Sequence, residues 1–145
     1  MQTQKIKVSK LHPDAIVPTR NNPADAGLDL HILEGGLLPP GHRVQFKTGI
    51  AIDIPEGYVG LIWSRSKLST QKGIQVLAGV VDAGYRGDIS VVLYNSGYEP
   101  VVFNAGDKLA QLLIQEVSLT ELELVDELPE SVRGTKGINC EDLRL

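Results

Sequence analysis

Short runs of β-branched and aromatic residues alternate with turn residues along most of the chain. Many short runs with regular turn signals are typical of a β-sandwich, jelly roll or barrel. Within this pattern, Ile50–Ile54 alternates in the way expected of a half-buried strand. The predicted strands are Lys5–Val8, Arg43–Lys47, Ile50–Ile54, Val59–Trp63, Ile74–Leu77, Ile89–Tyr94, Val101–Phe103, Leu109–Val117 and Leu122–Val125.

Helical periodicity is almost absent. No segment keeps apolar residues at i, i+3, i+4 and i+7 for three turns. One short segment, Ser66 to Lys72, could still form a helix of about two turns that ends at Gly73. We therefore predict an all-β fold, a jelly roll or barrel, with at most one short helix.

Composition narrows the class of protein. A chain of 145 residues suits one domain. The net charge of −4 argues against general nucleic-acid binding, although a small anionic ligand needs only a local group of cations. No apolar run reaches the roughly 20 residues of a membrane helix, and the N-terminus does not resemble a signal peptide. With one cysteine and three scattered histidines, we expect an intracellular protein without a disulfide, a zinc site or a membrane contact.

Two short segments carry polar groups that plain β structure does not need. Asp29 lies between two leucines after a glycine, where it is either a functional carboxylate or a turn residue that accepts a backbone N–H bond. Ser64–Leu68 places Arg65, Lys67 and two serines directly after a predicted strand. These groups suit a phosphate, and a helix starting at Ser66 would add its N-terminal dipole. A solvated loop with a capping serine fits equally well.

Two further segments have the same ambiguity. Asp82 precedes a glycine-rich turn, where we expect a semi-buried carboxylate able to deprotonate a water, and Tyr85 offers a flat face. A β-turn aspartate beside a core-edge tyrosine is the alternative. Arg133–Gly137 is suited to clasp a phosphate, or is a disordered tail. Together the four segments fit Mg²⁺-assisted attack of water on a polyphosphate.

The order of these segments resembles the trimeric dUTPase family, which five ordered motifs mark. Asp-x-x-Tyr-Arg-Gly within Gly79–Asp88 is similar to motif III, and the 17-residue step from Arg65 to Asp82 also matches the family. The other motifs correspond to Ala26–Leu30, Ser64–Leu68, Gly106–Leu112 and Arg133–Gly137.

This resemblance implies Mg²⁺-dependent hydrolysis of dUTP to dUMP and pyrophosphate in a dUTPase-like distorted jelly roll. Asp82 would activate water for attack on the α-phosphorus, Tyr85 would pack on the deoxyribose, and Asp29 would act on Mg²⁺ through water. The backbone from Leu77 to Val81 would bond to uracil, and Gln111 to the phosphates. The implied substrate-binding residues are Arg65, Ser66, Lys67, Leu77, Gly79, Val80, Val81, Tyr85, Gln111, Arg133, Lys136 and Ile138.

The resemblance also implies a homotrimer with shared sites. One subunit would supply motifs I, II and IV, a second would supply motif III, and a third the C-terminal arm. We expect a β-barrel catalytic domain over residues 1–126 and a flexible arm over residues 127–145. The expected location of the protein is the cytoplasm, or the host cytoplasm if the protein is viral.

The sequence departs from the family pattern in two motifs. Motif V usually carries a phenylalanine and a serine where this chain has Ile138 and Cys140. In motif II, Ser64 replaces a proline and Lys67 a glycine. We expect a working enzyme with weaker closure of the arm, and added charge from Lys67 near the phosphates.

Three other functions compete with this one. A dCTP deaminase carries a glutamate in the strand after the hairpin, whereas the segment from Asp88 to Leu93 has none. A nucleotide-binding regulator or protein-interaction homologue with little catalysis agrees with the unusual motif V. A purely structural jelly-roll module leaves the matching motifs as coincidences.

Overall fold

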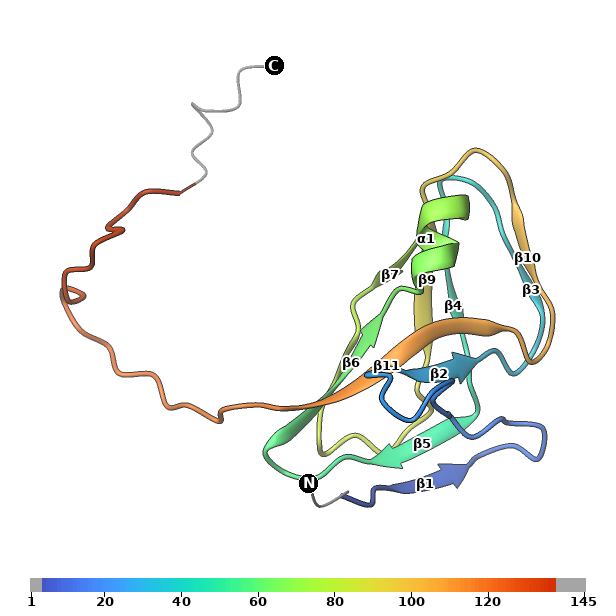
Figure 1. Cartoon of the computed structure of the whole chain (residues 1–145), viewed down its shortest axis with the longest axis horizontal. Helices are drawn as coiled ribbons and strands as arrows, with labels where there is room; N and C mark the ends of the chain where they lie inside the picture. The colour runs from blue at the N-terminus through green and yellow to red at the C-terminus, as the bar shows by residue number, and fades with distance from the viewer. Residues whose placement is uncertain (1–3, 138–145) are drawn as a thin grey trace.

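The computed structural model describes residues 4–137 and has an all-β architecture with one short helix in this range (Figure 1). Its elements are β1 (Lys7–Lys10), β2 (Leu28–His31), β3 (Gly36–Leu38), β4 (Arg43–Phe46), β5 (Ile50–Asp53), β6 (Tyr58–Trp63), α1 (Ser66–Lys72), β7 (Ile74–Leu77), β8 (Val80–Val81), β9 (Val91–Asn95), β10 (Val101–Phe103) and β11 (Lys108–Glu116).

The strands form small antiparallel sheets whose neighbours are mostly far apart in the sequence. The largest has the order β2-β11-β6-β8, and a second has the order β4-β9-β7. Strands β1 and β5 form one separate pair, and β3 and β10 form another. This pattern of long-range antiparallel pairing is that of a jelly roll. The helix α1 stands at one end of the sheets, between β6 and β7 (Figure 1).

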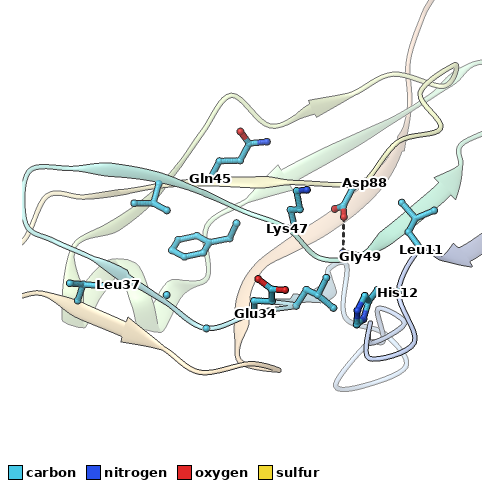
Figure 2. Close-up of a pocket in the computed structure, with 13 residues that line it drawn as sticks. Leu11, His12, Glu34, Leu37, Gln45, Lys47, Gly49 and Asp88 are labelled. Atoms are coloured by element: carbon cyan, nitrogen blue, oxygen red, sulfur yellow. Dashed lines mark hydrogen bonds between the residues drawn. The ribbon is translucent and has the colours of Figure 1, made fainter.

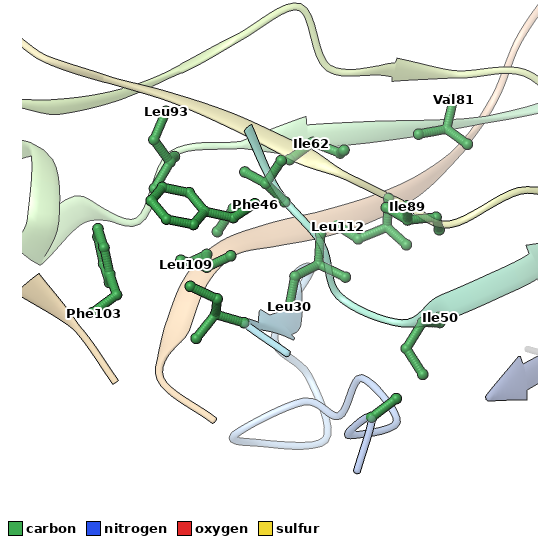
Figure 3. Close-up of a cluster of buried hydrophobic side chains, with 14 of the residues drawn as sticks. Leu30, Phe46, Ile50, Ile62, Val81, Ile89, Leu93, Phe103, Leu109 and Leu112 are labelled. Atoms are coloured by element: carbon green, nitrogen blue, oxygen red, sulfur yellow. The ribbon is translucent and has the colours of Figure 1, made fainter. Parts of the chain in front are cut away.

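The core lies between the inner faces of the two larger sheets (Figure 3). In the sheet that carries β2, β11 and β6, the side chains of Leu30, Leu112 and Ile62 are buried. The rings of Phe46 and Phe103 meet edge to face, with their centroids 5.5 Å apart, a favourable geometry for an aromatic pair. Because side chains alternate along a strand, the residues next to these inward leucines and isoleucines point to the outer face.

The sequence pattern predicts most of these elements correctly. The helix has the expected bounds, and Gly73 ends it with φ 70° while its N–H bonds to the carbonyls of Leu68 and Ser69. The pattern misses β2, β3 and β8, which are too short or too polar to show alternation. No helix within residues 4–137 has both the length and the apolar character needed to cross a membrane.

The predicted strand over residues 122–125 is wrong. After β11 ends at Glu116, all residues from 117 to 137 are exposed, and the chain leads away from the sheets (Figure 1). The side chains of Leu122 and Leu124 are 96% and 99% exposed. An alternating pattern makes a strand only where another strand offers its N–H and C=O groups, and this segment has no such neighbour within the described residues. The proposed boundary between residues 126 and 127 stays a prediction.

Candidate active site

A cavity of about 540 Å³ gathers most of the predicted phosphate-binding residues. It lies where β2 and β11 meet the start of α1, and its lining includes Asp29, Arg65, Ser66, Lys67 and Gln111. Lys108, the first residue of β11, also lines this cavity. The protein is acidic as a whole. A local group of three cations is therefore a specific feature of this cavity, suited to an anion.

Asp29 lies at the centre of the cationic group. Its carboxylate forms ion pairs with Lys108 Nζ at 2.7 Å and with Arg65 Nε at 3.5 Å, one through each oxygen. The Asp29 side chain is only 15% exposed. The alternative of a turn residue that caps a backbone N–H is wrong, because Asp29 belongs to β2 and its carboxylate holds two side chains.

The glycine before this strand has a steric role. Gly27 does not adopt a positive φ, so it is not needed there for an unusual turn. A side chain at this position would collide with the amide of Gln111. Gln111 in turn donates from Nε2 to the carbonyl of Ser64 at 3.0 Å. The absence of a side chain at Gly27 therefore lets Gln111 lie between β2 and the segment that carries Arg65.

Ser64 connects this cavity to the next structural element. Its hydroxyl accepts a hydrogen bond from the N–H of Val76 in β7 at 3.0 Å. A proline, the usual residue of the family here, has no such acceptor. Helix α1 begins at Ser66 with Arg65 as its N-cap and no side-chain cap, so the alternative of a capping serine is not found.

The hairpin between β7 and β8 holds the second group of predicted residues. Ala78 and Gly79 have φ values of 61° and 108°, and the chain passes there from one large sheet to the other. The carbonyl of Gly79 accepts a bond from the N–H of Ile62 at 2.7 Å. Glycine is required at position 79, because an added Cβ would lie 2.7 Å from the carbonyl oxygen of Ile62.

Asp82 and Tyr85 lie in the tight loop that follows β8. The N–H of Tyr85 donates to the carbonyl of Asp82 at 3.0 Å, and its hydroxyl donates to the carbonyl of Asp88 at 2.8 Å. Both residues line a cavity of about 230 Å³ together with Gly79, Val80 and Val81. Asp82 is exposed, so the expected semi-buried position is wrong for a single chain. Leu77 lies at the end of β7 and is not among the lining residues of this cavity.

An arginine fixes this loop to the body of the protein. Arg86 donates through Nη1 to the carbonyls of Ala83 and Tyr85, at 2.6 and 3.1 Å. Its Nη2 forms an ion pair with Asp53 of β5 at 2.6 Å. The guanidinium group thus spans the loop and ties it to a strand of another sheet, which sets where Asp82 can point.

The predicted site residues therefore lie in three separate places of one chain. We call the cavity with Arg65 and Lys108 the cationic cavity, and the cavity with Asp82 and Tyr85 the hairpin cavity. The two have no lining residue in common. Arg133 and Lys136 belong to the exposed segment after β11, where Arg133 Nε donates to the carbonyl of Lys136 at 2.8 Å. Ile138 and Cys140 lie outside the described residues. In the part of the chain that the structure describes, Asp82 and Arg65 therefore lie in different cavities.

A further cavity, of about 750 Å³, contains none of the predicted site residues (Figure 2). Its lining includes Glu34, Lys47 and Asp88. The Asp88 carboxylate accepts the N–H bonds of Thr48 and Gly49 at 3.2 and 3.1 Å, the second of which Figure 2 shows. The carbonyl of Asp88 also accepts a hydrogen bond from the Tyr85 hydroxyl. Asp88 therefore connects this cavity to the loop after β8 and helps to position that loop.

Metal ligands are sparse in the described part of the chain. Residues 4–137 contain no group of three or more histidine, aspartate or glutamate side chains that could hold a metal ion. Both oxygens of Asp29 already face cations. This donor set fits a Mg²⁺ ion whose direct ligands are waters and phosphate oxygens, with a protein carboxylate nearby, and does not fit an ion caged by side chains.

The comparison with known families decides the identity of this arrangement. The dUTPase family model matches residues 13–140, which include both cavities. The chain belongs to the dUTPase family. It is 43% identical over 135 residues to the deoxyuridine 5'-triphosphate nucleotidohydrolase of Corynebacterium glutamicum, a match that covers 91% of each chain.

Solved dUTPase structures share the fold. The dUTPase of Staphylococcus bacteriophage 80alpha with dUpNHpp has a TM-score of 0.88 and 31% identity, over 94% of this chain and 97% of that one. Phage dUTPases such as this neighbour are described as controlling the transfer of virulence genes by a proto-oncogenic G protein-like mechanism. A mutant dUTPase from S. aureus phage phi11, with a structural Mg(II) ion, has a TM-score of 0.81 and 33% identity, over 86% of this chain and 98% of that one.

Sequence reasoning missed the contacts that three residues make in this dUTPase-family site. Lys108 stands inside the segment that resembles motif IV, and its pairing with Asp29 becomes visible only when β2 and β11 are adjacent. Asp53 and Ser64 act through Arg86 and Val76, which are distant in the sequence. The sequence pattern of Ile50–Ile54 predicts that Asp53 points outward, but it does not predict the partner of Asp53.

Proposed function

We propose that this protein hydrolyses dUTP to dUMP and pyrophosphate. The observation that carries the proposal is the group of Arg65, Lys67 and Lys108 in one cavity with Gln111, in an otherwise acidic protein. This group suits a chain of phosphates, because charge that develops on phosphate oxygens in the transition state is stabilised by cations already in position. The dUTPase-family relatives support dUTP as the nucleotide.

Asp82 is the proposed general base. It would take a proton from a water whose oxygen attacks the α-phosphorus, while the bond to the bridging oxygen breaks and pyrophosphate leaves. Its carboxylate is exposed, and within residues 4–137 no hydrogen bond or ion pair engages it. Tyr85, held by the Asp88 carbonyl, presents its ring in the same cavity and would pack against the deoxyribose.

A Mg²⁺ ion bound by the phosphates would neutralise part of their charge. Asp29 is the carboxylate of the cationic cavity whose place suits a contact to such an ion through water. The backbone of residues 77–81 would bond to uracil, and rejection of other bases follows because polar groups paired by one base are left unpaired by another. Arg133, Lys136 and Ile138 would close over the bound nucleotide.

A homotrimer explains why the site residues lie apart in one chain. The Asp82 cavity of one copy would face the Arg65 cavity of a second, and the segment after β11 would reach a third. The exposed leucines of this segment support assembly, since Leu122, Leu124 and Leu128, the most exposed of them, lose contact with water when another copy covers them. An apolar cavity of about 590 Å³, lined by Val8, Ile52 and other residues, offers one such surface.

The test measures pyrophosphate released from dUTP, dTTP, dCTP and UTP, with Mg²⁺ and with a chelator. We expect release from dUTP alone, its loss with the chelator, and a reduction of several orders of magnitude in Asp82→Asn. Arg43→Gln, a change at an exposed cation outside both cavities, is the control and should leave turnover unchanged. Equal turnover of dUTP by Asp82→Asn and the wild type would refute the proposal.

A regulatory role is the second candidate. The relevant observation is the similarity to the phage 80alpha dUTPase, a phage dUTPase that is described as a controller of gene transfer. The two candidates separate in the same assay. Tight binding of dUTP without release of pyrophosphate would favour the regulator.

A further inference from the structure

Trp63 is a large aromatic residue in an unusual place. It is the only tryptophan of the chain and lies at the end of β6, with 59% of its surface exposed. A tryptophan left this exposed is more common at a binding surface than on an ordinary outer strand. The residue that follows it, Ser64, begins the segment that carries Arg65.

The strand register places Trp63 beside the phosphate-binding residues. In β11, Gln111 lies opposite Asp29 on one side and opposite Trp63 on the other. Directly opposed residues of antiparallel strands point to the same face, with Cβ atoms about 4.5–5.5 Å apart. The row Asp29, Gln111 and Trp63 therefore lies on the outer face of the sheet, and Trp63 is one strand beyond Gln111, which lines the cationic cavity.

On its other side, Trp63 borders the hairpin. It lines a cavity of about 400 Å³ with Ala78, Gly79 and Val80. Ala78 is the one non-glycine residue with a positive φ within residues 4–137. Backbone held in such a conformation concentrates at functional sites. Within one chain, Trp63 thus lies between the cationic cavity and the hairpin of residues 77–81, and in the proposed trimer that hairpin would face the cationic cavity of another copy.

We propose that the indole of Trp63 packs against the nucleoside of the bound nucleotide. This inference rests on the proposed function, because the phosphates in the cationic cavity fix where the nucleoside begins. A nucleoside attached to phosphates at Gln111 lies within reach of the neighbouring strand position, and that position is Trp63. Stacking on an aromatic side chain strengthens binding of a base roughly five- to 150-fold. Trp63 would supply an aromatic contact in a chain whose arm has Ile138.

The fluorescence of this single tryptophan tests the contact directly. The wild-type protein is titrated with dUpNHpp in the presence of Mg²⁺, and the accessibility of the indole is measured with acrylamide. We expect saturable quenching of the emission and a drop of at least twofold in the acrylamide quenching constant. Inorganic pyrophosphate, which carries no nucleoside, is the control and should leave the acrylamide constant unchanged.

Variants connect the fluorescence to function. Trp63→Ala should raise KM for dUTP about tenfold, with kcat within about twofold of the wild type, because a base contact contributes on this scale. Trp63→Phe should stay close to the wild type in KM. Tyr98→Ala removes another highly exposed aromatic residue, 95% exposed and in a turn outside both cavities, and should change neither constant.

Two results would overturn the inference. One is inhibition of turnover by dUpNHpp without any change in emission or acrylamide quenching. The other is an indole already shielded from acrylamide without nucleotide, which would make Trp63 a subunit contact. If the wild type released no pyrophosphate from dUTP, the proposed function would fail, whereas the dUpNHpp titration would still decide the role of Trp63. Should Trp63→Ala fail to fold, the wild-type titration and Trp63→Phe remain sufficient.

Discussion

Replacing Asp29 by asparagine tests whether this carboxylate positions the cations or only offsets their charge. The substitution keeps the shape of the side chain and removes the ion pairs with Lys108 and Arg65, now 2.7 and 3.5 Å long. A hydrogen bond to a charged group contributes about 1.5–3 kcal/mol, and an exposed ion pair about 0.2–1 kcal/mol. The side chains of Lys108 and Arg65 are 38% and 32% exposed. We therefore expect a loss of about 1–2 kcal/mol in the free energy of unfolding, after allowance for solvent screening.

The effect on catalysis should be larger than the effect on stability. Without Asp29, the guanidinium of Arg65 loses the partner that fixes its position, and a misplacement of about 1 Å in an active site costs up to a hundredfold in rate. We expect kcat for dUTP to fall about ten- to hundredfold. The assay is steady-state pyrophosphate release with Mg²⁺, together with urea unfolding of the same preparation.

A matched control separates position from charge. Asp25 lines the same cavity, but its carboxylate bonds only to Asn22 within the described residues. Asp25→Asn removes the same charge and should leave kcat within about twofold. If Asp25→Asn and Asp29→Asn had equal effects, or if Asp29→Asn lowered KM with kcat unchanged, Asp29 would only offset charge and the positioning argument would be refuted.

Three further predictions concern the loop, the hairpin and the arm. Asp53→Asn should lower kcat several-fold by freeing Arg86, and Asp53→Glu should restore part of the rate. Because the ion pair is exposed, Asp53→Asn should cost less than about 1 kcal/mol of stability. Equal kcat in the wild type and both variants would contradict a positioning role for Asp53. Gly79→Ala should cost about 2 kcal/mol or more in urea unfolding, since φ 108° and the Ile62 carbonyl both disfavour a side chain; unchanged stability would show that the hairpin is not strained there. Ile138→Phe should lower KM for dUTP or raise kcat. If the variant changed neither constant, the argument that Ile138 weakens closure of the arm would fail.

The all-β fold could be predicted from the sequence because its signal is local. Gly73 ends the helix through its own backbone freedom, and apolar runs between turn residues mark β4, β6 and β9. The expected half-buried alternation of Ile50–Ile54 is wrong, because Ile50, Ala51 and Ile52 are all buried. The strand β2 could not be found in this way. Its outward residue is a carboxylate whose desolvation is offset by Lys108, a residue 79 positions further along the chain. The run over residues 122–125 shows the opposite error, since a correct local pattern forms no strand without a neighbour.

The candidate residues could be named from the sequence, but the contacts that position them could not. The resemblance implies that motif II and motif III of one site come from different subunits, and the folded chain places Arg65 and Asp82 in different cavities. The contacts that aim these side chains come from Lys108, Asp53 and Ser64. Lys108 and Asp53 are ordinary in their local sequence, and Ser64 is noticeable there only as a replacement for the family's proline. Only the pairing of distant strands gives them a partner.

The account depends most on the claim that Asp82 of one copy completes the cationic cavity of another. The most direct test mixes two inactive variants, Asp82→Asn and Arg65→Ala, by unfolding and refolding them together. In a randomly mixed trimer, about a quarter of the sites would combine an intact Asp82 from one subunit with an intact Arg65 from its neighbour. We predict recovery of about a quarter of the wild-type rate of pyrophosphate release. A mixture that forms trimers yet stays as inactive as either variant alone would contradict the account.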